Sequence, residues 1–291
     1  MASDGSQPIF VCSIIRARKQ KMSDLYRNAD QVKFYASTRP TYPPELFHFV
    51  ASKAPSRQLA WDAGTGSGQA AVSLSSLFDS VVATDSSPEQ ISQAPTHHSN
   101  IRFVVTPPSL SLADLHRLVA PPGSVDLITV ATALHWFDIP AFFEQARSVL
   151  RRPGGVLAAW CYDSIVLCDG GRVEEIYRRL MEATWPYVVE DIRAIAHGGY
   201  AGVEFPFEAV EGVEEGTAPV RRFAVEKEMG VEGLISFLKS GTGYQRARAA
   251  GVELVTEEVL DEMKKACEED GEEVKKVKFP ISLRIGRMGS R

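Results

Sequence analysis

Three glycines and two acidic residues near the start of the chain have the types and spacing that suit binding of a small ligand. Gly64, Gly66 and Gly68 alternate with other residues and follow Asp62 in the stretch DAGTGSG. Alternating glycines allow positive φ angles and let a ligand approach the backbone closely. The second acid, Asp85, lies 21 residues after Gly64, and an acid there can bind both hydroxyls of a ribose. These residues predict a site for a nucleotide or nucleoside cofactor.

This site requires the glycines to lie between a strand and a helix. Residues 58–62 are predicted to form a short strand and residues 68–78 a helix, whose first unpaired N–H groups would point at the ligand. A second strand at 80–85 would place Asp85 at its end. In an open α/β sheet, ligands bind in the crevice beyond the carboxyl ends of the strands. The glycine loop and Asp85 are therefore expected at the same edge of one sheet.

Strands and helices continue to alternate up to residue 162. The remaining strands of this part are predicted at 100–105, 124–131 and 155–162, and the helices between them at 88–93, 110–119 and 140–150. Several strands are nearly continuous apolar runs, which suits parallel strands covered on both faces. The order of the elements predicts an α/β fold with a doubly wound parallel sheet and right-handed crossovers.

The character of the sequence changes after residue 163. Helices are predicted there at 173–184, 231–239 and 256–269, and strands at 204–211 and 278–285. At the other end, residues 1–33 do not resemble a folded segment and are expected to be a poorly ordered extension. The chain is therefore divided into that extension and one folded domain at 34–291. Within the domain, residues 34–162 are the cofactor-binding core, and 163–291 are a cap with the C-terminal strands.

The composition excludes several classes of protein. The chain has 291 residues, a formal net charge of −5 and 44% hydrophobic residues, as an ordinary globular protein has. No apolar run approaches the ~20 residues that cross a bilayer, and no basic stripe suits nucleic acid, so neither a membrane nor a nucleic acid is an expected partner. The four cysteines match no zinc or C-x-x-C spacing. They predict reduced thiols, no metal site and a cytoplasmic location.

Two kinds of cofactor compete for the glycine loop. Dinucleotide-dependent dehydrogenases use G-x-G-x-x-G, and the third glycine of that pattern would fall at Gln69. A nicotinamide-dependent Rossmann oxidoreductase is disfavoured but stays open, as does a non-catalytic binding protein of the same fold. The pattern present is an acid two residues before the first of three alternating glycines. It resembles motif I of class I S-adenosylmethionine-dependent methyltransferases.

The resemblance to these methyltransferases covers about residues 34–160. Val125–Thr129 is similar to their fourth-strand motif, and Leu150–Gly155 to their L-[KR]-P-G-G turn. Tyr35 with Arg39–Pro43, and likewise Ala133–Asp138, resemble segments of a narrower group in the type 11 branch. That group is the trans-aconitate methyltransferase-like and plant embryo-abundant-protein-like enzymes. The resemblance implies a Rossmann-like sheet of seven strands, the last antiparallel, with a helical cap.

The resemblance also implies which residues bind the cofactor, S-adenosyl-L-methionine. Asp62 would reach its amino group and Asp85 its ribose, while the three glycines lie along its amino acid part. Five more positions are expected to line this site, namely Tyr35, Ser86, Thr106, Ala131 and Thr132. Ser86 could equally cap the following helix, and Tyr35 could equally be a packing residue.

The expected reaction transfers a methyl group to a small-molecule acceptor, at a carboxylate or hydroxyl oxygen. His135 follows the fourth strand and is either a base for a hydroxyl acceptor or a packing residue in an aromatic wall. A carboxylate acceptor needs no base, and an arginine would bind it in bidentate fashion. The candidates for that contact are Arg193, Arg221, Arg222, Arg246 and Arg248. Trp185 and Tyr187 are expected to cap the substrate chamber, and the sequence indicates neither the acceptor nor the oligomeric state.

Overall fold

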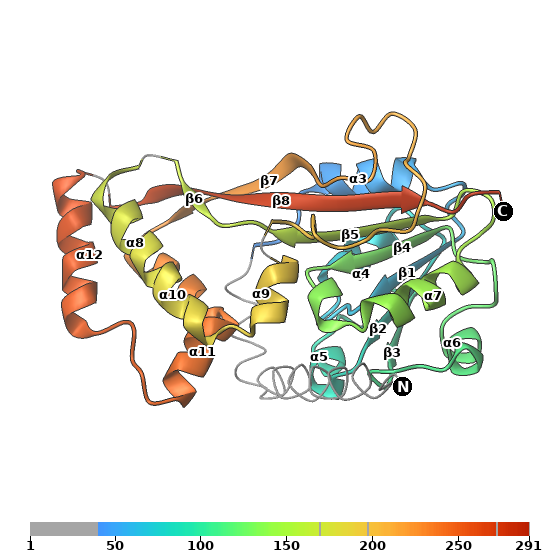
Figure 1. Cartoon of the computed structure of the whole chain (residues 1–291), viewed down its shortest axis with the longest axis horizontal. Helices are drawn as coiled ribbons and strands as arrows, with labels where there is room; N and C mark the ends of the chain where they lie inside the picture. The colour runs from blue at the N-terminus through green and yellow to red at the C-terminus, as the bar shows by residue number, and fades with distance from the viewer. Residues whose placement is uncertain (1–39, 169, 197, 272, 291) are drawn as a thin grey trace, which may run out of the picture.

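A single mixed β-sheet runs through the whole structure (Figure 1). The structure is a computed structural model and describes residues 40–168, 170–196, 198–271 and 273–290. Five strands run parallel in the order β3-β2-β1-β4-β5, and β8 lies antiparallel beside β5. Their bounds are Ile101–Val105, Ser80–Asp85, Leu59–Ala63, Leu127–Ala131 and Val156–Tyr162 for the parallel strands in that order, and Lys275–Arg287 for β8. The doubly wound sheet predicted from the sequence is confirmed.

Helices cover both faces of the parallel strands. α3 and α4 lie on one face, where Leu46 and Leu74 join a buried core, and α6 and α7 lie on the other, where Leu115 and Phe142 do so. The helices of this half are α3 Pro44–Ser52, α4 Gln69–Ser75, α5 Pro88–Ser92, α6 Leu112–Leu118 and α7 Ile139–Val149. Because both faces of the sheet are buried, its central strands are mostly apolar on both faces instead of alternating.

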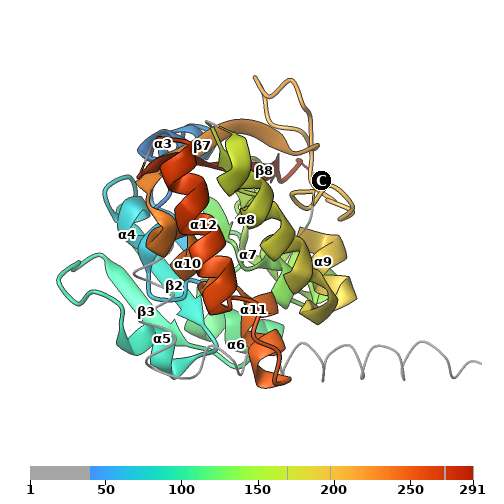
Figure 2. The ribbon, with the colours of Figure 1, turned by 90° about the vertical axis from the view of Figure 1, so that its left-hand side faces the viewer.

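The second half of the chain forms a cap of helices beyond the carboxyl ends of the parallel strands (Figures 1 and 2). The cap helices are α8 Gly171–Thr184, α10 Val231–Ser240, α11 Thr242–Ala249 and α12 Glu257–Glu269. They share a separate core that includes Tyr177, Leu234 and Met263. The three helices predicted in this region are confirmed, and α11 is an additional helix that the sequence analysis did not predict.

Three short helices lie where the cap meets the sheet. η2 (Leu134–Trp136) directly follows β4. η3 (Trp185–Tyr187) continues α8 and packs against α11. The chain then enters α9 (Glu190–Ala196), which packs against η2. The segment between η3 and α9 therefore passes from the cap to the edge of the sheet where the parallel strands end.

The sheet differs in several places from the predicted strands. Among the described residues it has eight strands instead of seven, because the strand predicted at 204–211 is absent and two strands are additional. One of these is β6 (Val166–Leu167), which extends the edge of β5 along β8. β7 (Val220–Met229) lies on β8 and was not predicted, since its charged residues mask the pattern of a strand. β4 begins at Leu127, three residues later than expected.

Residues 204–211, predicted to be a strand, form a loop with one bridge to the sheet, between Glu208 and Arg287. Phe205 and Phe207 both turn inward and pack edge-on against Phe143. A strand would send residues at i and i+2 to one face as well, but Pro206 lies between them and has no N–H to donate to a ladder. The apolar residues there reflect packing instead of sheet pairing.

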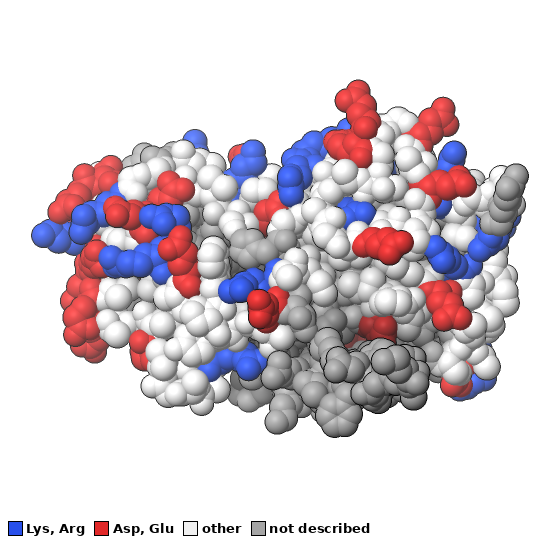
Figure 3. All heavy atoms as spheres, in the orientation of Figure 1, with Lys and Arg blue, Asp and Glu red and all other residues white. Residues whose placement is uncertain are grey.

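Some predictions fall outside the described part of the chain. The predicted extension at 1–33 and the site residue Tyr35 both lie there. Among the described residues, no helix is long and apolar enough to cross a membrane. Charged side chains of both signs cover the outer cap helices (Figure 3), where Arg172 and Arg179 of α8 both contact Glu262 of α12.

Candidate functional site

The glycine loop connects β1 to α4 in the way that the sequence predicts. Gly64, Gly66 and Gly68 have φ angles of 70°, 57° and 90°, a region that side chains other than glycine rarely adopt. A Cβ atom on Gly64 would lie 2.7 Å from the Cβ of Ala133. The first glycine is therefore needed for the loop to pack on the residues after β4.

Gly66 has a different environment from the other two. Among the described residues, a Cβ there would meet only the side chain of Gln90, at 3.6 Å. The Gly66 N–H donates to Asp85 Oδ2 at 2.8 Å. This glycine therefore leaves open space next to a carboxylate, which is the arrangement that a nucleoside cofactor lying along the loop would need.

Asp85 lies at the end of β2, facing the loop. Its other oxygen, Oδ1, accepts a hydrogen bond from the Ser87 N–H at 2.9 Å. Burial raises the pKa of Asp85, although hydrogen bonds from the N–H groups of Ser87 and Gly66 oppose the shift. No cation is paired with this carboxylate in the described part of the chain, so a ligand that donates hydroxyl protons would stabilise its charge.

The two polar candidates near Asp85 lie in different surroundings. Thr106 is buried, and its N–H donates to the backbone carbonyl of Asp85 at 2.8 Å. Ser86 is exposed. The cap of α5 is Ser87, whose hydroxyl accepts from the Gln90 N–H. The suggestion that Ser86 caps this helix is therefore wrong by one residue, because the capping position is the residue directly before Pro88.

Asp62 is fully buried beneath the loop. Thr65 Oγ1 donates to one of its oxygens at 2.5 Å and Thr129 Oγ1 to the other at 2.6 Å. Burial raises the pKa of Asp62 to about 6, although the hydroxyls of Thr129 and Thr65 favour the charged form. Both carboxylate oxygens thus contact the protein itself, and they tie the loop to the neighbouring strand β4.

The residues that follow β4 are held in a strained conformation. Thr132 has a φ of 57°, which is unusual for a β-branched residue. The Thr132 N–H donates to the Trp160 carbonyl at 2.7 Å, and its hydroxyl lies 2.9 Å from Tyr42 Oη. Such strain costs of the order of 1–3 kcal/mol and occurs at functional sites more than elsewhere. Ala131 and Thr132, both half-buried, lie at this edge of the sheet next to the glycine loop.

His135 lies in η2 with 8% of its surface exposed. Its Nδ1 is 3.2 Å from the hydroxyl of Tyr200, and its ring packs against that of Trp136. Tyr200 is fully buried, and burial raises its pKa well above the ordinary value, so the hydroxyl keeps its proton. The sequence analysis missed Tyr200. Two glycines before it indicate a tight turn, but nothing local connects it with a residue 65 positions earlier.

The turn that contains Tyr200 is held by two arginines of the antiparallel strands. Arg284 of β8 is buried, and its Nη1 donates to the Tyr200 carbonyl at 2.6 Å. Arg221 of β7 donates to the carbonyl of Gly198 at 3.2 Å. These two cations hold the turn that carries Tyr200, whose hydroxyl contacts His135.

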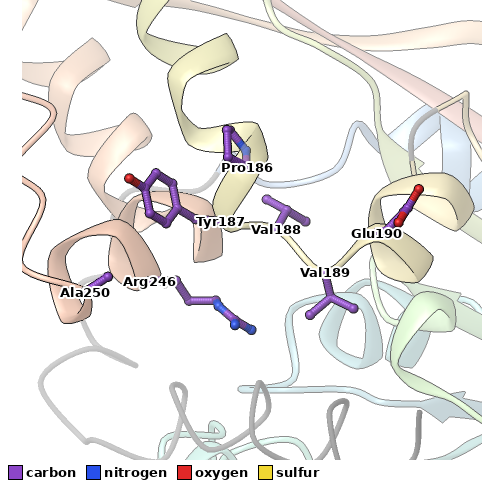
Figure 4. Close-up of a pocket in the computed structure, with 7 residues that line it drawn as sticks. All are labelled: Pro186, Tyr187, Val188, Val189, Glu190, Arg246 and Ala250. Carbon is purple, nitrogen blue, oxygen red and sulfur yellow. The ribbon is translucent and has the colours of Figure 1, made fainter. Parts of the chain in front are cut away.

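The five arginines considered for an acceptor carboxylate are placed differently. Arg221 also contacts Asp163, at 3.7 Å, and Arg222 stacks on the ring of Phe49 at 4.3 Å. Arg248 is exposed on α11, and Arg193 is half-buried on α9. Arg246 lines a pocket together with Tyr187, which was predicted to cap the substrate chamber (Figure 4).

The structure thus brings most of the predicted site residues to one edge of the sheet. The loop, Asp85 and Thr132 come from the ends of β1, β2 and β4. Neighbouring parallel strands end at the same edge, which explains why residues far apart in sequence meet there.

Known proteins that this chain resembles are described as methyltransferases. Residues 61–159 match the family described as "Methyltransferase domain". A protein of Dictyostelium discoideum named "Putative methyltransferase" is 29% identical over 259 residues, which cover 88% of this chain and 92% of that protein. "Methyltransferase cfoB" of Aspergillus candidus is 32% identical over 161 residues, which cover 50% of this chain but only 47% of the fungal protein.

A solved structure resembles the fold over most of its length. It is described as "a Putative Type II Methyltransferase from Anaeromyxobacter dehalogenans" and superposes with a TM-score of 0.70 at 29% identity. The match covers 87% of this chain and 99% of that one. It therefore includes the cap as well as the strands of the glycine loop. Together with the matched domain, these likenesses decide between the cofactors that the glycine loop left open: the protein is an S-adenosylmethionine-dependent methyltransferase with the Rossmann-like class I fold.

Proposed function

We propose that the protein methylates an oxygen atom of a small-molecule acceptor, and that the crevice at the carboxyl ends of β1, β2 and β4 binds the cofactor. The observation that carries this proposal is the open space at Gly66 next to Asp85, which has no cationic partner among the described residues. A ribose can donate two hydroxyl protons to a carboxylate in that position. The glycine backbone would then lie along the amino acid part of the cofactor.

The other predicted contacts are proposed with one refinement. Thr106 and Ser86 would lie near the adenosine, and Ala131 and Thr132 beneath the sulfonium. Tyr35 stays a prediction, because it lies outside the described residues. Asp62 would act through the loop that it holds, since it is fully buried and contacts Thr65 and Thr129, whereas Asp85 is only half-buried.

Methyl transfer mainly requires that the reacting atoms are aligned. The cofactor supplies a methyl group on a positively charged sulfur, and the leaving group is neutral. Holding nucleophile, methyl and sulfur in line can contribute about 7–11 kcal/mol. A hydroxyl nucleophile also has to lose its proton. We propose that His135 accepts it, with Tyr200 orienting the ring through Nδ1.

The finer assignments are proposals of the same kind. The resemblance of 133–138 to the trans-aconitate methyltransferase-like and plant embryo-abundant-protein-like group favours a small acid as the acceptor. The single sheet supports one folded domain whose cap follows residue 162. A cytoplasmic location stays a prediction from the cysteine pattern.

The cofactor site can be tested with two aspartates at opposite ends of one strand. Asp85 ends β2 at the crevice, whereas Asp79 is exposed just before β2 begins. We expect calorimetric titration with S-adenosylhomocysteine to show at least tenfold weaker binding to Asp85→Ala, about 1.4 kcal/mol. Asp79→Ala should bind like the original protein.

Three results would count against this proposal. One is equal affinity for the folded Asp85→Ala variant, and another is equal weakening by Asp79→Ala. The third is binding of NADH in place of S-adenosylhomocysteine, which would return the glycine loop to a nicotinamide-dependent function.

A further inference from the structure

The cap contains a pocket of about 410 Å³ whose ligand the proposed function leaves open (Figure 4). Its lining comes from η3, the start of α9 and the two residues between them, and from α11 with the residue that follows it, namely Pro186, Tyr187, Val188, Val189, Glu190, Arg246 and Ala250. We propose that this pocket binds the acceptor, and that Arg246 binds a carboxylate of the acceptor that is not the methylated group. This inference rests on the proposed function, since it names the substrate class of that reaction.

Arg246 is suited to an anionic ligand because its charge has no ion-pair partner among the described residues. Its side chain extends from α11 into the pocket (Figure 4). Its guanidinium forms no ion pair or hydrogen bond in the part of the chain that the structure describes, even though Glu190 lines the same pocket. A guanidinium against apolar walls gains most from a carboxylate, which it binds with two parallel hydrogen bonds.

The wall that carries Arg246 is packed tightly against its neighbours. A Cβ on Gly243 would lie 2.9 Å from the Cβ of Thr184 and 3.0 Å from Val188 Cγ2. The next residue, Tyr244, is buried, and its hydroxyl donates to Glu253 at 2.7 Å. Only a glycine lets α11 come this close to the segment that forms the opposite wall, so Gly243 determines how near the two walls of the pocket lie.

The position of the pocket suits an acceptor that reaches toward the sheet. Its Val188 and Val189 lie on the segment that leads into α9, and α9 packs against η2, the helix of His135. The cap itself lies beyond the carboxyl ends of the parallel strands (Figure 1). An acceptor held at Arg246 would therefore extend its other end toward the crevice proposed for the cofactor.

The lining restricts the chemical class of the acceptor. About 410 Å³ lies at the small end of ligand sites, which span roughly 300–1,000 Å³. Five of the seven lining residues are apolar or aromatic, and the one cation is accompanied by one acid, Glu190. Such a pocket suits a single carboxylate on an apolar body and disfavours a tricarboxylate, because the further negative charges would have no partner there.

Arg246 also indicates which oxygen accepts the methyl group. A carboxylate bound to a guanidinium is stabilised as an anion, which lowers its reactivity as a nucleophile. The accepting oxygen should therefore lie at the other end of the molecule. We assign the acceptor to the apolar hydroxy acids, with the hydroxyl directed toward His135.

The test compares two arginines of the same helix. Arg246 lines the pocket, whereas Arg248 is exposed two residues later. The probes are 3-(4-hydroxyphenyl)propanoate, its neutral amide and propane-1,2,3-tricarboxylate. Their binding is measured by ligand-observed NMR with S-adenosylhomocysteine present.

We expect Arg246→Gln to weaken binding of the monocarboxylate at least tenfold and to leave the weaker binding of the amide unchanged. Arg248→Gln should change neither. Arg246→Lys should fall between, because it keeps the charge but loses the bidentate contact. The affinity for S-adenosylhomocysteine, titrated separately, should be the same in all variants.

The inference would be overturned if Arg246→Gln bound the monocarboxylate as the original protein does. It would also be overturned if the original protein preferred the tricarboxylate or the amide, or bound none of the three. Failure of the proposed function gives a different result, namely loss of S-adenosylhomocysteine binding in the original protein. The two failures can therefore be told apart.

Discussion

Two fully buried aspartates lie at opposite edges of the parallel sheet, and their surroundings have opposite character. Asp126 lies at the amino end of β4, where Arg151 Nε donates to it at 2.6 Å and the N–H groups of Gln58 and Leu59 donate at 3.0 and 3.1 Å. Asp62 lies at the carboxyl end of β1 and accepts from two threonine hydroxyls, with no cation beside it in the described part of the chain.

The difference appears in their ionisation. Burial opposes ionisation of Asp126, but the hydrogen bond from Arg151 and those from the backbone outweigh it, so its pKa is lowered. At Asp62 the effect of burial prevails and raises the pKa to about 6. At the amino edge of the sheet, the charge of Asp126 is satisfied by a structural ion pair and backbone hydrogen bonds. The other edge holds a buried carboxylate with a raised pKa beside positive-φ residues, which is typical of a functional site.

The largest effect is expected from filling the space at the loop. Gly64→Ala adds a Cβ at 2.7 Å from that of Ala133 in a positive-φ conformation. We expect a loss of about 3 kcal/mol in unfolding free energy, from the left-handed backbone and the overpacking together. Binding of S-adenosylhomocysteine should weaken at least a hundredfold. Urea unfolding and calorimetry measure the two quantities.

Gly123 provides a matched control at the other edge. It has a φ of 65°, and a Cβ there would meet no atom of the described residues within 4 Å. Gly123→Ala should cost only about 1–2 kcal/mol and leave binding unchanged. Gly66 also has room for a Cβ. The Gly66→Ala variant should therefore fold, and it should still bind S-adenosylhomocysteine weakly. If the Gly64 and Gly123 variants lost equal stability and equal affinity for S-adenosylhomocysteine, the proposed difference between the two edges of the sheet would be contradicted.

The second effect is a difference in pH dependence. Because the folded pKa of Asp62 is raised from 3.8 to about 6, its ionisation opposes folding once the pH exceeds the unfolded value. The penalty grows between about pH 4 and 6 and should reach about 2–3 kcal/mol. Relative to the original protein, Asp62→Asn should therefore gain that much stability from pH 4 to pH 7.

Asp126 should behave in the opposite way. Its pKa is lowered in the folded state, so its contribution is fully present above the unfolded value of about 3.9 and disappears only as the pH falls below it. Asp126→Asn should cost about 1.5–3 kcal/mol, constant from pH 5 to pH 7. Urea unfolding of both variants across pH 3–7 tests this; parallel curves would contradict the comparison.

The smallest effect is expected at Tyr200. Tyr200→Phe removes the hydroxyl that lies 3.2 Å from His135 Nδ1 and should lower the unfolding free energy by about 1 kcal/mol. If Tyr200 orients a base, kcat for a hydroxyl acceptor should fall about tenfold, or ~1.4 kcal/mol. The KM of the acceptor and the affinity for S-adenosylhomocysteine should not change. An unaltered kcat and pH profile would leave Tyr200 a purely structural role.

The cofactor half of the site was readable from the sequence because its signals are local. A strand, a glycine loop and a helix follow one another within 59–75, and Asp85 ends the next strand. Alternating glycines and apolar strands predict their own conformations, and parallel strands place their ends at one edge. Even so, the sequence could not show that Asp62 is fully occupied by Thr65 and Thr129, since Thr129 belongs to another strand.

The acceptor half was decided by the tertiary structure. Arg246 was one of five candidate arginines, and only the packing of α11 against residues 184–188 places it in a pocket. Tyr200 meets His135 across 65 residues, in a turn held by Arg284 of the last strand. Contacts of this kind depend on how a cap folds back onto a sheet. Local sequence patterns do not predict these long-range contacts, because each residue considered alone resembles an ordinary surface or core residue.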